Sequence, residues 1–184
     1  MQRIKALDPK TTTGKSKELF EGIEAKLGMV PNMMRTMGNS PAVLSAYLNF
    51  NDQLGKSTLG ARLGELIAIS VANANGCEYC NAAHSFIGEN LVGIDKKILE
   101  LAKEGKSSDP KTEAALRFSR KLVTTKGRVS NNDINEVRNA GYSDGAITEI
   151  IAHTALNIFT NYFNNALVVD VDFPKTSLVE TAAA

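Results

Sequence analysis

Apolar residues recur every three or four positions along most of this chain, which is the spacing of residues that share one face of an α-helix. The pattern is clear in residues 16–27, 63–71 and 147–163. No segment alternates apolar and polar residues over the length of a strand, and the glycine-rich loops of nucleotide-binding α/β proteins are missing from the sequence. The chain is therefore expected to be all-α.

Capping residues and breakers set the expected helix boundaries. Ser40 and Asp109 each precede a proline, which suits the first position of a helix, and Ser130 with Asp133 has the spacing of a capping box. Gly28 and Gly76 stand where helices can end. Helices are expected at residues 16–27, 41–54, 63–74, 81–91, 98–103, 114–123, from 130 onward, and 143–168.

The remaining segments carry three further expectations. The methionine-rich residues 32–37 follow Pro31 and are expected to form a turn. The last helix is the most apolar segment and is expected to lie at the centre of the fold. Residues 170–184 lose the helical pattern, so an extended or frayed C-terminal tail is expected on a single domain that spans 1–184.

The overall charge excludes several classes of partner. Lys and Arg number 21 against 20 Asp and Glu, a net charge of +1, so nothing attracts nucleic acid or an anionic membrane. No apolar run approaches the ~18 residues that a bilayer span needs. Two cysteines are too few for a disulfide-rich secreted scaffold. The sequence predicts a cytoplasmic protein whose partners are neither nucleic acid nor membrane.

The two cysteines form a CxxC pair with a histidine close behind. Cys77, Cys80 and His84 fall at i, i+3 and i+7, which is one face of a helix. At a helix start, the free N–H groups and the dipole favour a thiolate, and an imidazole that accepts the thiol proton favours it further. A CxxC pair can also close into a disulfide once one sulfur is oxidised. The pattern predicts a reactive thiol and a two-thiol redox cycle.

Glu65 is the fourth candidate residue. It lies beside Leu66 and Ile67 in the least polar stretch of the chain, where a carboxylate needs a partner. A tight hairpin at Gly76 would bring Glu65 level with His84. The carboxylate would then fix the imidazole tautomer and stabilise its protonated form. We therefore expect Glu65 to tune His84.

Two other interpretations of this group remain open. Free cysteines are often buried core residues without chemistry. Two thiolates, one imidazole and one carboxylate could also bind zinc, although structural zinc sites usually use two well-separated ligand pairs. Our expectation is that no metal or flavin is bound.

Glu65, the run Cys77-Glu78-Tyr79-Cys80 and His84 together resemble the active-site motif of the alkylhydroperoxidase D family, within the carboxymuconolactone decarboxylase superfamily. Residues 31–41 and 153–164 resemble the peroxidase-related branch. The resemblance implies an AhpD-like helical domain, with the CxxC at the start of a helix, that assembles as homo-oligomers, trimers or hexamers. One position departs from the family, because Tyr79 stands where those proteins have a histidine.

The resemblance also implies a role for each residue. Cys80 would be the peroxidatic thiol that becomes a sulfenic acid, and Cys77 would resolve it as a disulfide. Glu65 and His84 would relay protons. The substrate would be a small hydroperoxide, and the electron donor a lipoyl-bearing protein or another dithiol. Tyr79 is expected to line the substrate site, where its hydroxyl can bond a peroxide or a water.

A polar stripe runs along the last predicted helix. His153, Asn157, Asn161 and Asn164 recur on one face of an otherwise apolar segment. The stripe is either an internal polar seam or the lining of a subunit interface or active-site floor. His153 and Asn157 are included as candidate substrate-lining residues.

Three functions are compatible with these features. The leading hypothesis is a thiol-dependent peroxidase that reduces alkyl hydroperoxides through a CxxC disulfide cycle. A lactone enzyme of the carboxymuconolactone decarboxylase type is an alternative, but those enzymes generally lack the CxxC pair. The third is a non-catalytic redox sensor or assembly protein, in which the disulfide alters packing.

Overall fold

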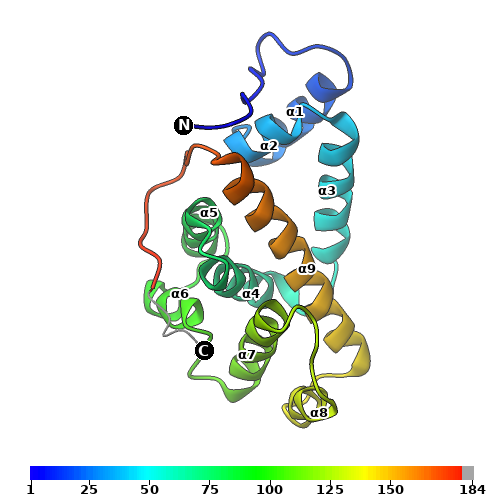
Figure 1. The fold of residues 1–184 in the computed structure, drawn as a ribbon, viewed down its shortest axis with the longest axis vertical. Helices are drawn as coiled ribbons and strands as arrows, with labels where there is room; N and C mark the ends of the chain where they lie inside the picture. Colours follow the sequence, from blue (N-terminus) through cyan, green and yellow to red (C-terminus); the bar gives the residue numbers. More distant parts are fainter. Residues whose placement is uncertain (180–184) are drawn as a thin grey trace.

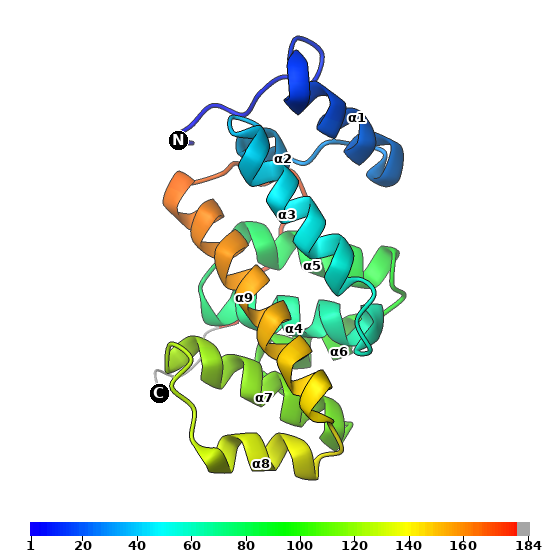
Figure 2. The same ribbon diagram turned by 90° about the vertical axis from the view of Figure 1, so that its right-hand side faces the viewer.

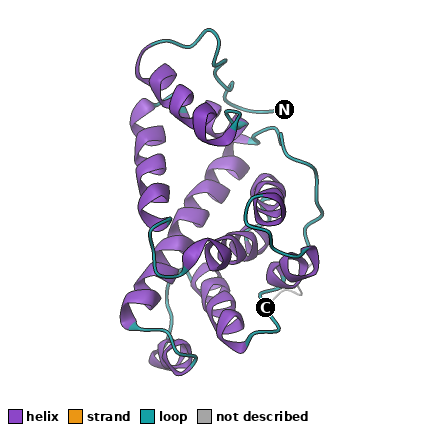
Figure 3. Cartoon of the chain, turned by 180° about the vertical axis from the view of Figure 1, so that it is seen from behind, coloured by secondary structure: helices purple, strands orange, loops and turns teal. Residues whose placement is uncertain are grey.

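The structure is a computed structural model that describes residues 1–179, and within this range it contains helices and loops but no strand (Figures 1 and 3). The all-α prediction is confirmed. The helices are α1 (Gly14–Leu27), α2 (Asn32–Met37), α3 (Pro41–Leu54), α4 (Gly60–Ala74), α5 (Glu78–Asn90), α6 (Lys96–Lys103), α7 (Pro110–Thr124), α8 (Asn131–Asn139) and α9 (Asp144–Leu167). No helix in this range is both long and apolar enough to cross a membrane.

The predicted caps stand at the helix starts. The side chain of Ser40 accepts from the backbone N–H of Val43 at 3.4 Å, and that of Asp109 accepts from Thr112 at 2.9 Å. Ser130 begins α8 with a complete capping box. Each such bond satisfies one of the N–H groups that the first turn of a helix leaves free. The capping residues therefore locate these helix starts correctly.

The expectation of a turn at residues 32–37 is wrong, because this segment forms the helix α2. Six residues give too few intrahelical hydrogen bonds to make a helix stable by itself. Here tertiary contacts supply the stability: Met33 and Met37 are buried, and the carboxylate of Asp172 accepts from the N–H of Asn32 at 2.7 Å. A partner so distant in sequence is invisible to local pattern analysis.

The helix at the centre of the fold is α4, not α9 as expected. α4 packs against α5, α6, α7 and α9, and it is buried along almost its whole length. α9 is the longest helix and crosses the molecule beside α3 and α4 (Figure 2). Its outer face leaves Ile151, Phe159 and Tyr162 exposed. The apolar residues of α9 surround the helix on all sides, so their number does not place it in the interior.

The buried apolar residues form two clusters. The α4–α7 core gathers side chains from α4, α6, α7, α8 and the first half of α9, among them Ile67, Leu116 and Ile150. The cysteine-side core gathers side chains from α1, α2, α3 and α5, and it includes Cys77 and Cys80. α4 contributes to both clusters and connects them.

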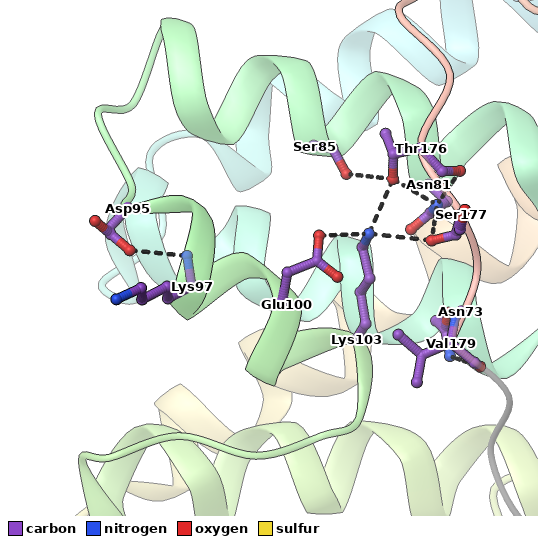
Figure 4. Close-up of polar contacts among 10 residues, drawn as sticks. All are labelled: Asn73, Asn81, Ser85, Asp95, Lys97, Glu100, Lys103, Thr176, Ser177 and Val179. Atoms are coloured by element: carbon purple, nitrogen blue, oxygen red, sulfur yellow. Dashed lines mark hydrogen bonds and ion pairs between the residues drawn. The ribbon is translucent and has the colours of Figure 1, made fainter.

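The chain beyond α9 is extended and makes specific contacts. It leaves the end of α9, passes α5 and reaches α6 (Figure 1). Thr176 and Ser177 accept hydrogen bonds from the buried Lys103 of α6, and Val179 pairs with Asn73 of α4 (Figure 4). The expected tail was 170–184; its last residues, 180–184, lie outside the described residues.

Candidate active site

The turn between α4 and α5 places the cysteines. α4 ends at Ala74, and Gly76 adopts a left-handed conformation with φ of 60°, which suits a residue without a Cβ. The N–H of Cys77 returns to the carbonyl of Ala72 at 2.9 Å. Cys77 then caps α5, its sulfur accepting from the N–H of Cys80 at 3.4 Å. The CxxC pair therefore stands at a helix start, as predicted.

Both cysteines are free thiols in the interior of the protein. Cys77 is 0% exposed and Cys80 is 2% exposed. Cys80 lines a cavity of about 300 Å³, whereas Cys77 does not. A small molecule in the cavity would therefore meet the sulfur of Cys80 and not that of Cys77.

Glu65 and His84 form the predicted pair. The Nδ1 atom of His84 lies 2.8 Å from Oε2 of Glu65, and both side chains are about one-fifth exposed. Burial acts to lower the pKa of His84, but the charge and hydrogen bond of Glu65 outweigh it, so the pKa is raised. Because Nδ1 is taken by Glu65, Nε2 is the nitrogen left to exchange a proton with another group.

An amide from α9 supports the sulfur of Cys80. Asn164 donates from Nδ2 to Sγ of Cys80 at 3.1 Å, and the same Nδ2 lies 3.3 Å from Sδ of Met33. A thioether has no hydrogen to donate, so the amide nitrogen, and not its oxygen, must face these sulfur atoms. Thr160 adds a hydroxyl 4.0 Å from the Cys80 sulfur.

These contacts favour a thiolate at Cys80. Burial acts to raise the pKa of the Cys80 thiol, but the hydrogen bond from Cys77 and the charge of His84 outweigh it, with help from Asn164 and Asn161. The pKa is lowered to about 6. The hydrogen bond with Cys80, together with burial, raises the pKa of Cys77. At neutral pH these opposite shifts favour one negative charge on the pair, held by the sulfur of Cys80.

The cavity combines a polar wall with apolar surroundings. Six of its lining residues are the polar and sulfur-bearing candidates from the sequence, namely Glu65, Tyr79, Cys80, His84, His153 and Asn157. Most of the remaining lining is apolar and comes from α1, α2, α3, α4, α5, α9 and the chain after α9. Leu27 and Leu91 line the cavity and are exposed, so they mark the side on which it opens.

Tyr79, the departure from the family motif, is buried beside the cysteines. Its hydroxyl accepts a hydrogen bond from the backbone N–H of Met33 at 3.2 Å. Burial raises the pKa of Tyr79, and Asp172 adds to this effect, so the phenol stays protonated. The hydroxyl keeps a proton to donate, which differs from an imidazole that shuttles one.

The polar stripe of α9 divides into two parts. His153 and Asn157 line the cavity; His153 contacts Ser57 at 3.1 Å, and burial lowers the pKa of His153. Asn161 and Asn164 lie deeper, around the Cys80 sulfur and outside the cavity lining. One helix face thus serves both the cavity wall and the thiol.

Within residues 1–179, no three side chains of His, Cys, Asp or Glu are grouped so that they could hold a metal ion. The sulfur of Cys77 accepts from the backbone N–H of Cys80, and the sulfur of Cys80 accepts from the side-chain amide of Asn164.

Comparison with known proteins finds a matching family model and similar solved structures. The model of the carboxymuconolactone decarboxylase family matches residues 41–91, which include the CxxC pair, Glu65 and His84. No curated protein sequence matches the chain. An uncharacterized peroxidase-related protein from Silicibacter sp. TM1040 is 26% identical, with a TM-score of 0.79 over 92% of this chain and 94% of that chain. Residues 41–91 thus match the carboxymuconolactone decarboxylase family, and the chain as a whole has the fold of alkylhydroperoxidase D-like, peroxidase-related proteins.

Two further solved structures share the fold. A peroxidase-related protein from Ralstonia eutropha JMP134, with an alkylhydroperoxidase AhpD core, is 24% identical, with a TM-score of 0.80 over 93% of this chain and 92% of that chain. A cysteine-to-alanine variant of the debrominase Bmp8, in complex with 2,3,4-tribromopyrrole, is 23% identical, with a TM-score of 0.77 over 92% of this chain and 91% of that chain. The fold therefore hosts more than one chemistry, and the reaction must follow from the site.

Three contributions to the site escaped the sequence. The sequence did not predict that Asn164 contacts Cys80, although the polar stripe on the last helix, which includes Asn164, could have indicated a polar contact there. Phe173 lines the cavity from a segment without periodicity, so no local pattern marked it. Lys103 is 1% exposed and holds that segment, yet it resembles any lysine in the last turn of an amphipathic helix.

Proposed function

We propose that this protein is a thiol peroxidase that reduces organic hydroperoxides at Cys80. The observation that carries the proposal is the position of Cys80, which lines an apolar cavity together with the Glu65–His84 pair, while Cys77 is buried behind it. This arrangement supports a reaction that uses Cys80 as the nucleophile, His84 as the proton donor and Cys77 as the second thiol.

The first step is oxidation of Cys80. The thiolate attacks the outer peroxide oxygen, so an S–O bond forms and the O–O bond breaks. The leaving alkoxide takes a proton from protonated His84 and becomes an alcohol. Cys80 is left as a sulfenic acid. Glu65 stabilises the protonated form of His84 before the step, and its hydrogen bond of 2.8 Å keeps the ring oriented.

The second step uses Cys77. Its sulfur attacks that of Cys80, the S–S bond forms, and hydroxide leaves as water with the proton that Cys77 gives up. A dithiol donor then reduces the disulfide and restores both thiols, and the proton of Cys80 returns to His84. A lipoyl group is the donor that the family resemblance favours. The sum is hydroperoxide plus dithiol giving alcohol, water and disulfide.

The cavity favours an uncharged, largely apolar substrate. Burial of a hydrocarbon group against the apolar lining would be favourable, because it removes apolar surface from water. The cavity volume of about 300 Å³ lies at the small end of the range for small-molecule sites. Among residues 1–179, no lysine or arginine lines the cavity to bind a carboxylate or a phosphate. We therefore expect an organic hydroperoxide of modest size to be the better substrate.

The test is peroxide consumption by metal-free protein with tert-butyl hydroperoxide, a small organic hydroperoxide, and dihydrolipoamide. Wild type should turn over many times, and Cys80→Ser should lose turnover by at least about a thousandfold, as removal of a catalytic nucleophile does. Cys77→Ser is the matched variant: serine is a good helix cap, so α5 should form, yet one peroxide should be consumed per chain and a sulfenic acid should persist.

The same assay separates the rival functions. A redox sensor would oxidise once and stop even in the presence of the dithiol. Wild-type turnover by Cys80→Ser would remove the basis for the proposal. A lactone enzyme would act on its substrate in both cysteine variants, because its reaction does not use the thiols.

A further inference from the structure

The extended chain after α9 is attached at two points on either side of Phe173. On one side, Asn32 makes two hydrogen bonds: its backbone N–H donates to the carboxylate of Asp172 at 2.7 Å, and its side-chain amide donates to the carbonyl of Asp170 at 3.0 Å. On the other side, Thr176 accepts from Lys103 at 2.9 Å. We call residues 170–179 the C-terminal strap.

Lys103 is the main anchor of the strap. Its ammonium group lies in the interior and contacts Glu100 at 2.9 Å, the hydroxyl of Thr176 at 2.9 Å and the carbonyl of Ser177 at 3.1 Å (Figure 4). Two of its three acceptors belong to the strap, so the lysine is satisfied only when the strap is in place. A buried ammonium group that loses its acceptors is costly, which couples Lys103 to the strap.

Two buried asparagines reinforce the anchor. Asn81, on α5 directly after Cys80, donates to the carbonyl of Thr176 at 3.0 Å and to that of Ser177 at 3.2 Å. Asn73 of α4 exchanges two hydrogen bonds with the backbone of Val179, at 3.1 and 2.8 Å. The strap is thus bound to the two helices that carry the cysteines and Glu65.

Phe173 is the strap residue that reaches the cavity. Its ring packs edge-on against Tyr79 and tilted against Phe86, each with centroids 5.9 Å apart, and it lines the same cavity as Cys80. Thr176 follows Phe173 by three positions, a distance of at most about 10 Å even in a fully extended chain, so the anchor limits how far the ring can withdraw.

We propose that Phe173 is a specificity-determining residue that sets the size limit for molecules reaching Cys80, with Lys103 as the positioning residue that holds it there. That the excluded molecules are hydroperoxides rests on the proposed function, but the size limit itself can be measured without peroxide turnover. A bulky hydroperoxide would be rejected by the ring, and a small one would pass.

The experiment measures alkylation of Cys80 by iodoacetamide and by the larger N-phenylmaleimide. A Cys77→Ser background leaves Cys80 as the only thiol, since the chain has 2 cysteines. Phe173→Ala should raise the ratio of the maleimide rate to the iodoacetamide rate by about tenfold, the discrimination that an apolar pocket wall commonly provides. Phe159→Ala, on the outer face of α9 and away from the cavity, is the matched control and should leave the ratio unchanged.

The anchor is tested in the same way. Lys103→Met should raise the ratio, whereas Lys97→Met, whose exposed side chain lies on the same helix away from the strap (Figure 4), should not. Because Lys103→Met can fail to fold, Thr176→Val is the second variant; it removes one acceptor of Lys103 without altering the core. It should change the ratio in the same direction by a smaller factor.

An unchanged ratio in a folded Phe173→Ala variant would overturn the size limit. A raised ratio in Phe173→Ala but not in Thr176→Val would overturn the role of Lys103. Failure of the proposed function looks different, because wild type would then show no peroxide turnover while the alkylation ratio still responded to Phe173→Ala.

Discussion

The two cores of this protein are built differently. The α4–α7 core consists of buried apolar side chains, including Leu116 and Ile150 at 0% exposure. The cysteine-side core contains two thiols and a buried tyrosine. In the described part of the chain, buried polar atoms without a hydrogen-bond partner stand on Ser70, Asn81, Asn161, Asn164 and Asp172, and Asn164 contacts Cys80 itself.

This difference separates stability from chemistry. Apolar burial in the α4–α7 core stabilises the fold without directional requirements. Around Cys80 the protein instead buries amides whose hydrogen bonds are incomplete, which costs stability. Such groups are retained where a charge has to be held, and here the charge is the Cys80 thiolate.

The largest expected effect is a loss of stability without a change in thiol chemistry. Leu116→Ala should destabilise the fold by about 2–5 kcal/mol, because it opens a cavity in the α4–α7 core. Urea unfolding measures the loss, and Leu101→Ala, at a side chain 39% exposed, is the matched control. Alkylation of Cys80 in the folded variant should match wild type; a large change would show that the two cores are not independent.

Asn164→Leu should change the reactivity of the Cys80 thiol and have little effect on the stability of the fold. The substitution keeps the volume but removes the donor 3.1 Å from the Cys80 sulfur. A hydrogen bond to a charged group is worth about 1.5–3 kcal/mol, so thiolate reactivity at neutral pH should fall by about tenfold or more. Iodoacetamide kinetics against pH measure the shift. Asn165→Leu, at the exposed neighbouring position, should behave as wild type.

Glu65→Gln should lower peroxide turnover by about tenfold, an effect at the small end of those seen for acid–base groups. The amide keeps a hydrogen bond to His84 but removes the charge that raises the pKa of His84. The activity should therefore decline at a lower pH on the alkaline side than in wild type. Glu89→Gln, on the exposed face of α5, is the control. An unchanged pH profile would mean that the pair has only a structural role.

The pH profile of Cys80 alkylation gives the finest test. Its rate should rise with pH, reach half its maximum at about pH 6, and level off above, because the thiolate predominates once the pH exceeds the pKa. Removal of the Cys77 hydrogen bond in Cys77→Ala should move the midpoint upward. A midpoint near that of an ordinary thiol in wild type would contradict the proposed environment.

Much of this site was predictable from local patterns. The CxxC pair, a glycine that ends one helix and a capping position that begins the next are all encoded within a few residues, so the cysteines at the start of α5 followed from the sequence. The contact between Glu65 and His84 followed from the same hairpin. Their catalytic roles remain predictions.

Other features had no local signal. α2 was expected to be a turn because its stability depends on Asp172, far along the chain. The central position was assigned to α9 and belongs to α4, because apolar content does not reveal which neighbours surround a helix.

The sequence by itself determined the all-α fold class, several helix caps and the position of the CxxC pair at a helix start. These depend on periodicity, caps and spacing, which act between residues close in the chain. Only the tertiary structure decided that Asn164 supports Cys80, that Cys80 and not Cys77 lines the cavity, and that Lys103 holds Phe173 in its wall. Each of these depends on the packing of distant segments, and the helical period gives the face of a residue but not what that face meets.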